Sequence, residues 1–384
     1  MKLMKGTNKM SMINELSAVS RKKEENFFLR VVKYFLPWRG DNLGEIFRKI
    51  VFVGSIVFFC LSIQAVVDYY QVDAKEIERH DEIVQLAPDF INDDNDEFEW
   101  EIDYQGPTSE GGSEGDMPQS NLNNDNTTVY EQWNGLLKQN KDTMGWIKIP
   151  TYIDENGEQY INYPVMYSKE VFEIAGGKTE DFYLHHNFDK KWTESGTLYI
   201  DKRCYVNSAN DRSDVLTIYG HHMKRLGNMF TRLAEYKSGV EFLKQNPIIS
   251  FDTLYTKNQK YIIIGCYIVN EKAEYDNGEL FDYWRYRDFD EEHSFEKFIS
   301  EINKRSWYHS DIKCTAEDDY ITLSTCSNEA GQSKLRWVIT ARKLKASDDV
   351  DALIDSYRDN DNIYFPRNWI KAKGNKTVYD GWWY

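Results

Sequence analysis

An uninterrupted apolar run near the start of the chain limits most strongly what this sequence can fold into. Residues 50–67, IVFVGSIVFFCLSIQAVV, contain only Ser and Gln as polar interruptions. A helix of this length is about 27 Å long, against a hydrocarbon core of about 30 Å in a bilayer. We therefore expect one slightly short membrane crossing. The alternatives are a buried helix of a soluble domain and a cleaved signal peptide, whose charged leader would be unusually long here.

The charge on either side of this run indicates its orientation. The 384 residues carry a formal net charge of −16, yet residues 1–49 hold eleven Lys and Arg against five Asp and Glu. The positive-inside rule places this basic end in the cytoplasm and everything after Val67 outside the cell. We expect a single-pass protein of the cell membrane that contacts lipid through residues 50–67. Because the exported part is acidic and repels phosphates, nucleic acid is not expected as a partner.

The segment after the membrane run has the composition of a spacer. We expect residues 68–127 to form a short juxtamembrane helix followed by an acidic flexible linker. Residues 88–127 contain twelve Asp and Glu and no Lys or Arg, a composition that cannot offset the entropy cost of ordering. As a coil, this stretch would reach on the order of 35 Å and would lift the following domain off the membrane. The folded domain is expected over residues 128–384.

The pattern within residues 128–384 is mostly that of short strands separated by Gly, Asn and Asp turns. The predicted strands are GWIKIP (145–150), YINYPVMY (160–167), GTLYID (196–201), VLTIYG (215–220), YIIIGCYIV (261–269), YITLSTC (320–326) and RWVITARK (336–343). Such spacing favours a β-barrel or a sandwich. Two helices interrupt the strands. One lies between about Ser238 and Pro247, and the other is SFEKFISEINK with Ser294 as its N-cap.

A cysteine at the end of a predicted strand is the first candidate for chemistry. In YITLSTC, alternation puts Ile321 and Leu323 on the core face and Cys326 on the opposite face, at the strand terminus. A lone cysteine is more often a small buried apolar residue than a nucleophile, so its surroundings must decide.

Two further candidates lie on other predicted strands. In VLTIYGHHM, Gly220 lets the backbone turn before His221 and His222, of which only one can share a site with a given group. For His222 we favour a structural, hydrogen-bonded role. Arg336 opens the strand that begins ten residues after Cys326, and a hairpin would bring it back beside the cysteine. Taken singly, each signal is weak, because a strand-end Arg is usually just solvated.

Taken together, these segments resemble the sortase family. TLSTC (322–326), YGHHM (219–223) and Arg336 are similar to the TLxTC, YGH and downstream Arg of sortases. The resemblance covers most of residues 144–344, and INYPVMY, YLHHNFDKKWTESGTLYID and GHHMKRLGNMF resemble class B. Class C members usually carry a second membrane segment, which residues 345–384 lack. The resemblance implies a mainly β fold, an eight-stranded sortase-type barrel with peripheral helices, preceded by a single transmembrane helix and a flexible tether.

The resemblance also implies an activity, that of a cysteine transpeptidase of Gram-positive bacteria. Cys326 would attack the threonine carbonyl of an LPXTG-like or NPQTN-like sorting signal on a secreted protein. His221 would carry the proton, and Arg336 would hold the substrate and offset charge on the tetrahedral oxygen. The acyl group would pass to an amine of the cell wall or its precursor, or to a pilin. We also expect Ser324 and Thr325 to contact the substrate.

Other interpretations of these residues stay open. Asn328 could steer the imidazole in a papain-like arrangement, whereas His185 and His186 fit structural positions of the family. No metal-binding cluster is visible, so neither a metal nor another cofactor is expected. A cysteine peptidase without transfer and a catalytically silent, surface-displayed binding domain are the alternative functions. The joint presence of a candidate thiol, imidazole and guanidinium speaks against the silent domain.

Overall fold

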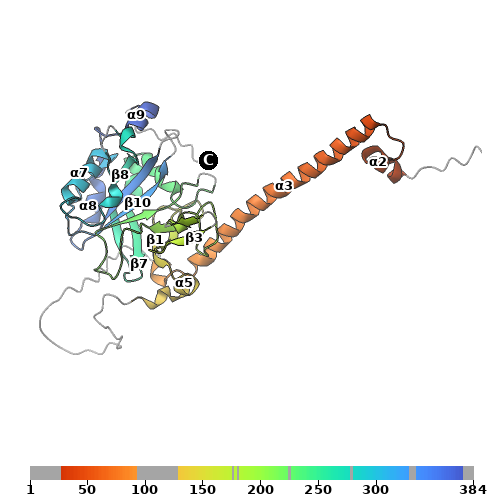
Figure 1. The fold of residues 1–384 in the computed structure, drawn as a ribbon. Helices are drawn as coiled ribbons and strands as arrows, with labels where there is room; N and C mark the ends of the chain where they lie inside the picture. Colours follow the sequence, from red (N-terminus) through yellow and green to blue (C-terminus); the bar gives the residue numbers. More distant parts are fainter. Residues whose placement is uncertain are drawn as a thin grey trace, which may run out of the picture. The chain divides into compact units, whose positions relative to one another are not determined.

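The computed structural model divides the chain into two compact units, Met1–Glu78 and Arg79–Tyr384 (Figure 1). The residues that the structure describes are 27–92, 129–174, 177–179, 181–223, 226–276, 280–327 and 334–374. The first 26 residues, Asn328 and most of the expected linker therefore lie outside the described residues.

The first unit is helical. It contains α2 (Phe27–Phe35) and most of α3 (Leu43–Val84). The start of α3 is capped by Asn42, whose side-chain oxygen accepts a hydrogen bond from the amide of Glu45 at 2.9 Å, while the Glu45 carboxylate accepts from the amide of Asn42. This reciprocal pair is a capping box, which satisfies amides that a helix N-terminus leaves unpaired. Helix α3 includes the expected run 50–67 and is long and apolar enough to cross a membrane.

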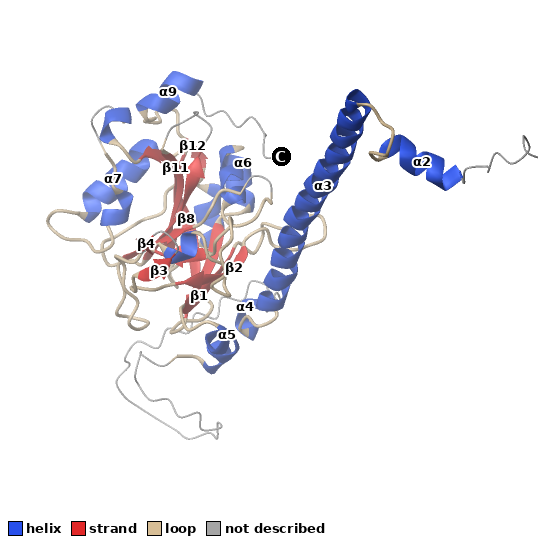
Figure 2. Ribbon diagram, turned by 45° about the vertical axis from the view of Figure 1, so that its right-hand side comes forward, coloured by secondary structure: helices blue, strands red, loops and turns tan. Residues whose placement is uncertain are grey.

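The second unit is built on a closed barrel of eight strands, which confirms the predicted barrel (Figure 2). Around the barrel the strands are β1 (Thr143–Lys148), β2 (Asn162–Met166), β5 (Leu198–Ile200), β6 (Val215–Tyr219), β10 (Tyr320–Ser327), β11 (Leu335–Lys343), β8 (Lys260–Asn270) and β7 (Ile248–Thr253). Neighbours pair antiparallel except β2 with β5 and β6 with β10, which are parallel. Seven of the eight coincide with predicted strands, and β7 was not predicted.

Short helices and two small sheets surround the barrel. The α-helices of this part are α4 (Asp89–Asn92), α5 (Asn134–Gln139), α6 (Val240–Gln245), α7 (Phe295–Arg305), α8 (Val350–Asp355) and α9 (Arg367–Lys373). The 3₁₀ helices of this part are η1 (Glu131–Trp133), η2 (Phe182–Leu184), η3 (Thr231–Lys237), η4 (Ala273–Tyr275) and η5 (Tyr283–Arg285). The small sheets pair β3 (Phe172–Ile174) with β4 (Gly177–Thr179) and β9 (Tyr308–His309) with β12 (Arg358–Asp359).

Both predicted helices are confirmed, as α6 and α7. Ser294 precedes α7, and its hydroxyl accepts a hydrogen bond from the Lys297 amide at 3.3 Å. The apolar face of α7 is buried through Phe298 and Ile302. Full burial of one such side chain stabilises the fold by about 1.5–3 kcal/mol.

Both faces of β10 and β11 are buried, so the strands that carry the candidate cysteine and arginine are held on two sides. One face places Leu323 and Trp337 in the largest apolar cluster, where the Trp337 indole donates to the Leu233 carbonyl oxygen at 2.7 Å. The opposite face packs with α7 in a second cluster, to which Tyr320 and Val338 belong. Close packing on both faces therefore restricts the movement of β10 and β11.

A third cluster joins residues on either side of the expected linker. Ile83, Ala87 and Ile91 are buried with Trp133 and Trp146. Residues on both sides of the undescribed stretch 93–128 therefore pack in one cluster. The compact unit accordingly begins at Arg79, ahead of the expected boundary at residue 128.

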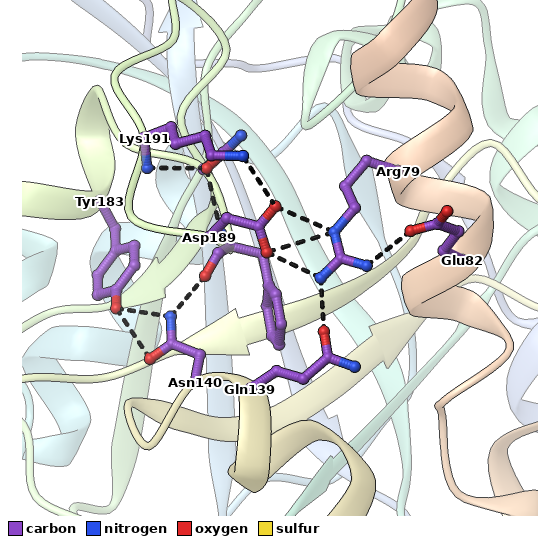
Figure 3. A network of polar contacts seen from close by, with 9 residues as sticks. Arg79, Glu82, Gln139, Asn140, Tyr183, Asp189 and Lys191 are labelled. Atoms are coloured by element: carbon purple, nitrogen blue, oxygen red, sulfur yellow. Dashed lines mark hydrogen bonds and ion pairs between the residues drawn. The ribbon is translucent and has the colours of Figure 1, made fainter.

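A polar network reinforces this packing (Figure 3). The guanidinium of Arg79 donates to the Asp189 carboxylate through Nε at 3.0 Å and Nη2 at 2.8 Å, and through Nη1 to Glu82 at 2.7 Å. Its Nη2 also contacts the side-chain oxygen of Gln139 on α5. Asp189 lies in the loop that joins η2 to β5. Arg79 therefore ties this loop to α5, since a planar guanidinium can serve several acceptors at once.

Candidate active site

Cys326 and Arg336 are directly opposite each other in the antiparallel ladder of β10 and β11. Opposed residues on one sheet face have Cβ atoms about 4.5–5.5 Å apart, which long side chains bridge easily. Here Nη1 of Arg336 lies 2.7 Å from Sγ of Cys326 and donates a hydrogen bond to it. Arg336 therefore lies beside Cys326, as the sequence predicts. The side chain of Cys326 is half-buried.

The other side of the Arg336 guanidinium contacts a carboxylate. Nε and Nη2 lie 2.6 Å and 2.5 Å from Oε1 of Glu271, the residue that follows the end of β8. Burial lowers the pKa of the arginine, but the neighbouring Cys326 and Glu271 raise it, and the net pKa lies above its ordinary value. The guanidinium therefore stays charged at any physiological pH.

His221 follows β6 immediately after Gly220, and its ring is hydrogen-bonded to backbone. Nε2 lies 2.7 Å from the carbonyl oxygen of Leu184, the last residue of η2. Since a carbonyl oxygen only accepts, Nε2 carries the hydrogen, and a neutral ring then has its lone pair on Nδ1. The ring of His185 lies 5.2 Å away, centroid to centroid.

The surroundings of His221 favour the neutral form of its ring. Burial lowers the pKa of the imidazole, the charges of His185 and Arg336 lower it further, and the hydrogen bond to Leu184 opposes them. The net direction is downward from the ordinary value. Desolvation and nearby positive charge both disfavour an imidazolium.

The three predicted site residues lie at one rim of the barrel. Strands β6 and β10 run parallel, with Tyr219 opposite Ser324 as their last pair. The Gly220 amide donates to the Ser324 carbonyl oxygen at 3.2 Å and extends the pairing by one step. His221 and Cys326 each follow this last pair by two residues, so they leave the barrel at the same edge.

Gly220 occupies a position that tolerates no side chain. A Cβ atom there would lie 2.4 Å from Cδ2 of Leu198 and 2.7 Å from Cδ2 of Phe230. The Phe230 amide also donates to the His221 carbonyl oxygen at 3.0 Å. The close approach of these neighbours fixes the backbone from which the imidazole projects.

The two residues expected to contact substrate are buried. Ser324 is 1% exposed, and its hydroxyl lies 2.7 Å from the hydroxyl of Tyr283. Thr325 is fully buried and opposite Trp337 in the ladder. Neither side chain is accessible to a peptide in this structure. Their burial supports a role in packing beneath Cys326. Direct substrate contact by either residue stays a prediction.

The remaining candidates lie around this rim or outside the described residues. Nδ1 of His186 lies 2.7 Å from the Phe182 carbonyl oxygen, and its ring stacks on that phenylalanine, as a structural histidine would. The backbones of His222 and Met229 pair in an isolated antiparallel β-bridge. The role considered for Asn328 falls outside the described residues. Within the described ranges, no group of three or more His, Cys, Asp or Glu side chains could hold a metal ion.

Sequence reasoning missed Glu271 and the Leu184 carbonyl oxygen, which contact Arg336 and His221. Glu271 is 65 positions from its partner, so no local pattern indicates the contact. Leu184 contributes a backbone atom, which every residue type has.

Comparison with known proteins identifies the family. The chain is 32% identical to sortase B of Listeria monocytogenes over 219 residues, 57% of this chain and 76% of that protein. It is 29% identical to sortase B of Staphylococcus aureus over 57% of this chain and 77% of that protein. A solved complex of S. aureus sortase B with substrate is 28% identical, with a TM-score of 0.45, and covers 57% of this chain and 87% of that one. No family model matches the chain.

The fold and these relatives define a cysteine transpeptidase. The chain belongs to the sortase B family. The family resemblance expected from TLSTC, YGHHM and Arg336 is thereby confirmed, as is the enzyme class.

Proposed function

We propose that this enzyme cleaves an LPXTG-like or NPQTN-like sorting signal after its threonine and transfers the acyl group to a cell-wall amine. The observation that carries the proposal is the 2.7 Å contact between Nη1 of Arg336 and Sγ of Cys326, in a chain of this family. A cation at this distance stabilises a thiolate, which is the reactive form of cysteine. The substrates are secreted proteins that bear the signal.

In the first half-reaction, His221 takes the proton of the Cys326 thiol, and the resulting thiolate attacks the carbonyl carbon of the signal's threonine so that a carbon–sulfur bond forms. Arg336 offsets the charge on the tetrahedral oxygen, a contribution of about 10²–10³ in rate for one donor. When the carbon–nitrogen bond breaks, His221 protonates the departing amine. The product is a thioester between the signal and the enzyme.

In the second half-reaction, an amine of the cell wall or its precursor attacks the thioester. His221 takes a proton from the amine, the carbon–sulfur bond breaks, and a new amide is released. A pilin lysine is the alternative acceptor. If water attacks instead, the enzyme is a peptidase without transfer.

The proposed location follows from the charge pattern and from α3. Residues 1–49 lie in the cytoplasm, residues 50–67 cross the membrane, and the catalytic unit lies outside the cell. The apolar stretch of α3, none of which is buried in protein, supports a membrane environment. Proteolysis of intact cells tests this orientation, since it should remove the catalytic unit and spare an epitope placed before residue 27.

Peptide cleavage by the full chain in detergent tests the proposed chemistry. Wild-type protein should cleave a fluorogenic sorting peptide, and Cys326→Ala, His221→Ala and Arg336→Ala should each abolish most turnover. Cys314→Ala is the matched control, because that thiol lies outside the rim and donates to the Ile312 carbonyl oxygen. Full activity of Cys326→Ala would refute the assignment of Cys326 as the nucleophile.

Product analysis separates transfer from hydrolysis. With triglycine present, mass spectrometry should detect the signal peptide joined to triglycine. Cleavage that gives only the hydrolysed peptide would favour the peptidase. No cleavage of any peptide in a signal library would favour the silent binding domain.

A further inference from the structure

The carboxylate of Glu271 and the thiol of Cys326 contact opposite parts of one guanidinium. Nε and Nη2 of Arg336 point to Oε1 of Glu271, and Nη1 points to Sγ of Cys326. A guanidinium is planar and rigid, so fixing its Nε and Nη2 edge also fixes the direction of Nη1. The side chains of Arg336 and Glu271 are 28% and 26% exposed, which leaves the pair only partly screened by water.

Glu271 is itself held by backbone pairing. Its amide donates to the Lys334 carbonyl oxygen at 3.1 Å, directly beyond the pair that Asn270 makes with Leu335. Asn270 is fully buried. Strands β8 and β10 flank β11 on its two sides. The carboxylate after β8 and the thiol on β10 therefore contact Arg336 from opposite sides. Hydrogen bonds of the sheet therefore set the spacing of all three groups.

We propose that Glu271 is a positioning residue for the transpeptidation reaction, which orients Arg336 by its Nε and Nη2 edge so that Nη1 faces the sulfur of Cys326. This inference rests on the proposed function, in which the arginine offsets charge at the reacting centre. Without the carboxylate, Arg336 would have to be ordered during each reaction, at a cost in rate. Glu271 touches neither substrate nor sulfur in this role.

The carboxylate also holds the cation electrostatically, since a charge-assisted contact of this kind is stronger than one between neutral groups. The other groups that interact with Arg336 electrostatically are Tyr199, Tyr283 and His221.

Two substitutions separate orientation from charge. Glu271→Gln keeps an acceptor oxygen for the guanidinium and removes the charge, so kcat/KM should fall only about 3-fold. Glu271→Ala removes both, and kcat/KM should fall about 30-fold or more, chiefly through kcat, since the lost contact acts in the transition state. Glu274→Gln is the matched control. That glutamate is 63% exposed and forms its ion pair with Lys272 at 3.7 Å.

The second comparison uses Glu271→Asp, which keeps the charge but withdraws the carboxylate by one methylene. In the full chain in detergent, kcat for peptide cleavage should fall about 10-fold while KM stays within about 2-fold of wild type, because a displaced guanidinium loses its contact in the transition state. Glu274→Asp should leave both values in place.

The outcomes distinguish this inference from the proposed function. Wild-type kcat/KM in Glu271→Ala, or wild-type kcat in Glu271→Asp, would overturn the positioning role. Because Glu271→Asp and Glu271→Gln change the side chain little, they test the inference even if Glu271→Ala fails to fold. Full activity of Cys326→Ala would instead overturn the proposed function.

Discussion

Nε2 of His221 is hydrogen-bonded to the carbonyl oxygen of Leu184 at 2.7 Å. The proton carrier proposed for catalysis is therefore oriented by backbone of the turn η2, and in its neutral form the ring accepts protons at Nδ1. Burial lowers the pKa of this imidazole, with further lowering by His185 and Arg336.

The titration of His221 should reflect these neighbours. We expect its midpoint, followed by NMR on histidine-labelled protein, to lie below the ordinary value of about 6.5. Arg336→Gln should raise the midpoint, because it removes a positive charge that disfavours the imidazolium. A wild-type midpoint at or above the ordinary value would contradict the assignment of burial as the dominant cause.

The same lowered pKa makes stability depend on pH. The unfolded chain binds a proton at this histidine more tightly than the folded chain does, so protonation favours unfolding. The free energy of unfolding should fall as the pH decreases from about 6.5 toward the lower folded pKa, and should be insensitive to this group above that window. Urea unfolding between pH 8 and pH 5 measures the slope. His221→Gln should flatten it, and an unchanged slope would count against the effect.

Replacing Arg336 by lysine should be nearly as damaging as removing it. An ammonium is a point charge and cannot reproduce a fork that contacts Glu271 and Cys326 together. We expect kcat/KM for peptide cleavage to fall about 10²–10³-fold. Arg358→Lys is the control, since Arg358 on β12 is 56% exposed and pairs with Asp311. Near-normal activity of Arg336→Lys would show that charge alone suffices.

The Arg79 network should contribute to the stability of the second unit. Arg79→Ala removes the hydrogen bonds to Asp189 from a half-buried site, a loss of about 1–3 kcal/mol. Thermal unfolding should show a Tm lowered by several degrees. Lys191→Ala is the control, because this lysine is 77% exposed and 3.9 Å from the same carboxylate. If both substitutions lower the Tm equally, the network is not the cause.

A methyl group at Gly220 should harm both the fold and the site. The added Cβ would overlap Leu198 and Phe230, and overpacking of this kind costs about 1–3 kcal/mol. We expect a lower Tm together with weaker peptide cleavage. Gly135→Ala provides the comparison, since a Cβ there meets Leu86 at an ordinary 3.8 Å and alanine favours a helix. Equal losses in both variants would argue against the predicted overlap.

Alternation and turn residues were enough to predict most of the barrel. The missed strand, β7, shows where that signal ends. All six of its residues are buried, and its first two residues, Ile248 and Ile249, are both apolar, so it does not start with the period of two that identifies a half-buried strand. Its closeness to the predicted helix before Pro247 also hid it. For β10 the pattern was read correctly on one face, but its other face, with Thr322 and Ser324, is buried as well.

The site was predictable where a side chain recurs in a recognisable motif. Cys326 and Arg336 could be placed together because a hairpin links consecutive strands. The acidic composition of residues 88–127 says nothing about the segment before it, so it could not indicate that the compact unit begins at Arg79. Ile83 and Ile91 pack in the barrel unit through contacts that are distant in sequence, and such contacts have no local signature.

Activity can first appear only after β6 has paired with β10. The paired residues Val215 and Tyr320 are roughly a hundred positions apart, and pairing over such a separation is slow because a long loop must close first. The thiol on β10 meets the imidazole after β6 only once this closure has occurred. A half-folded chain therefore holds this thiol apart from the imidazole, and the cleavage proposed for the pair waits until the barrel has closed.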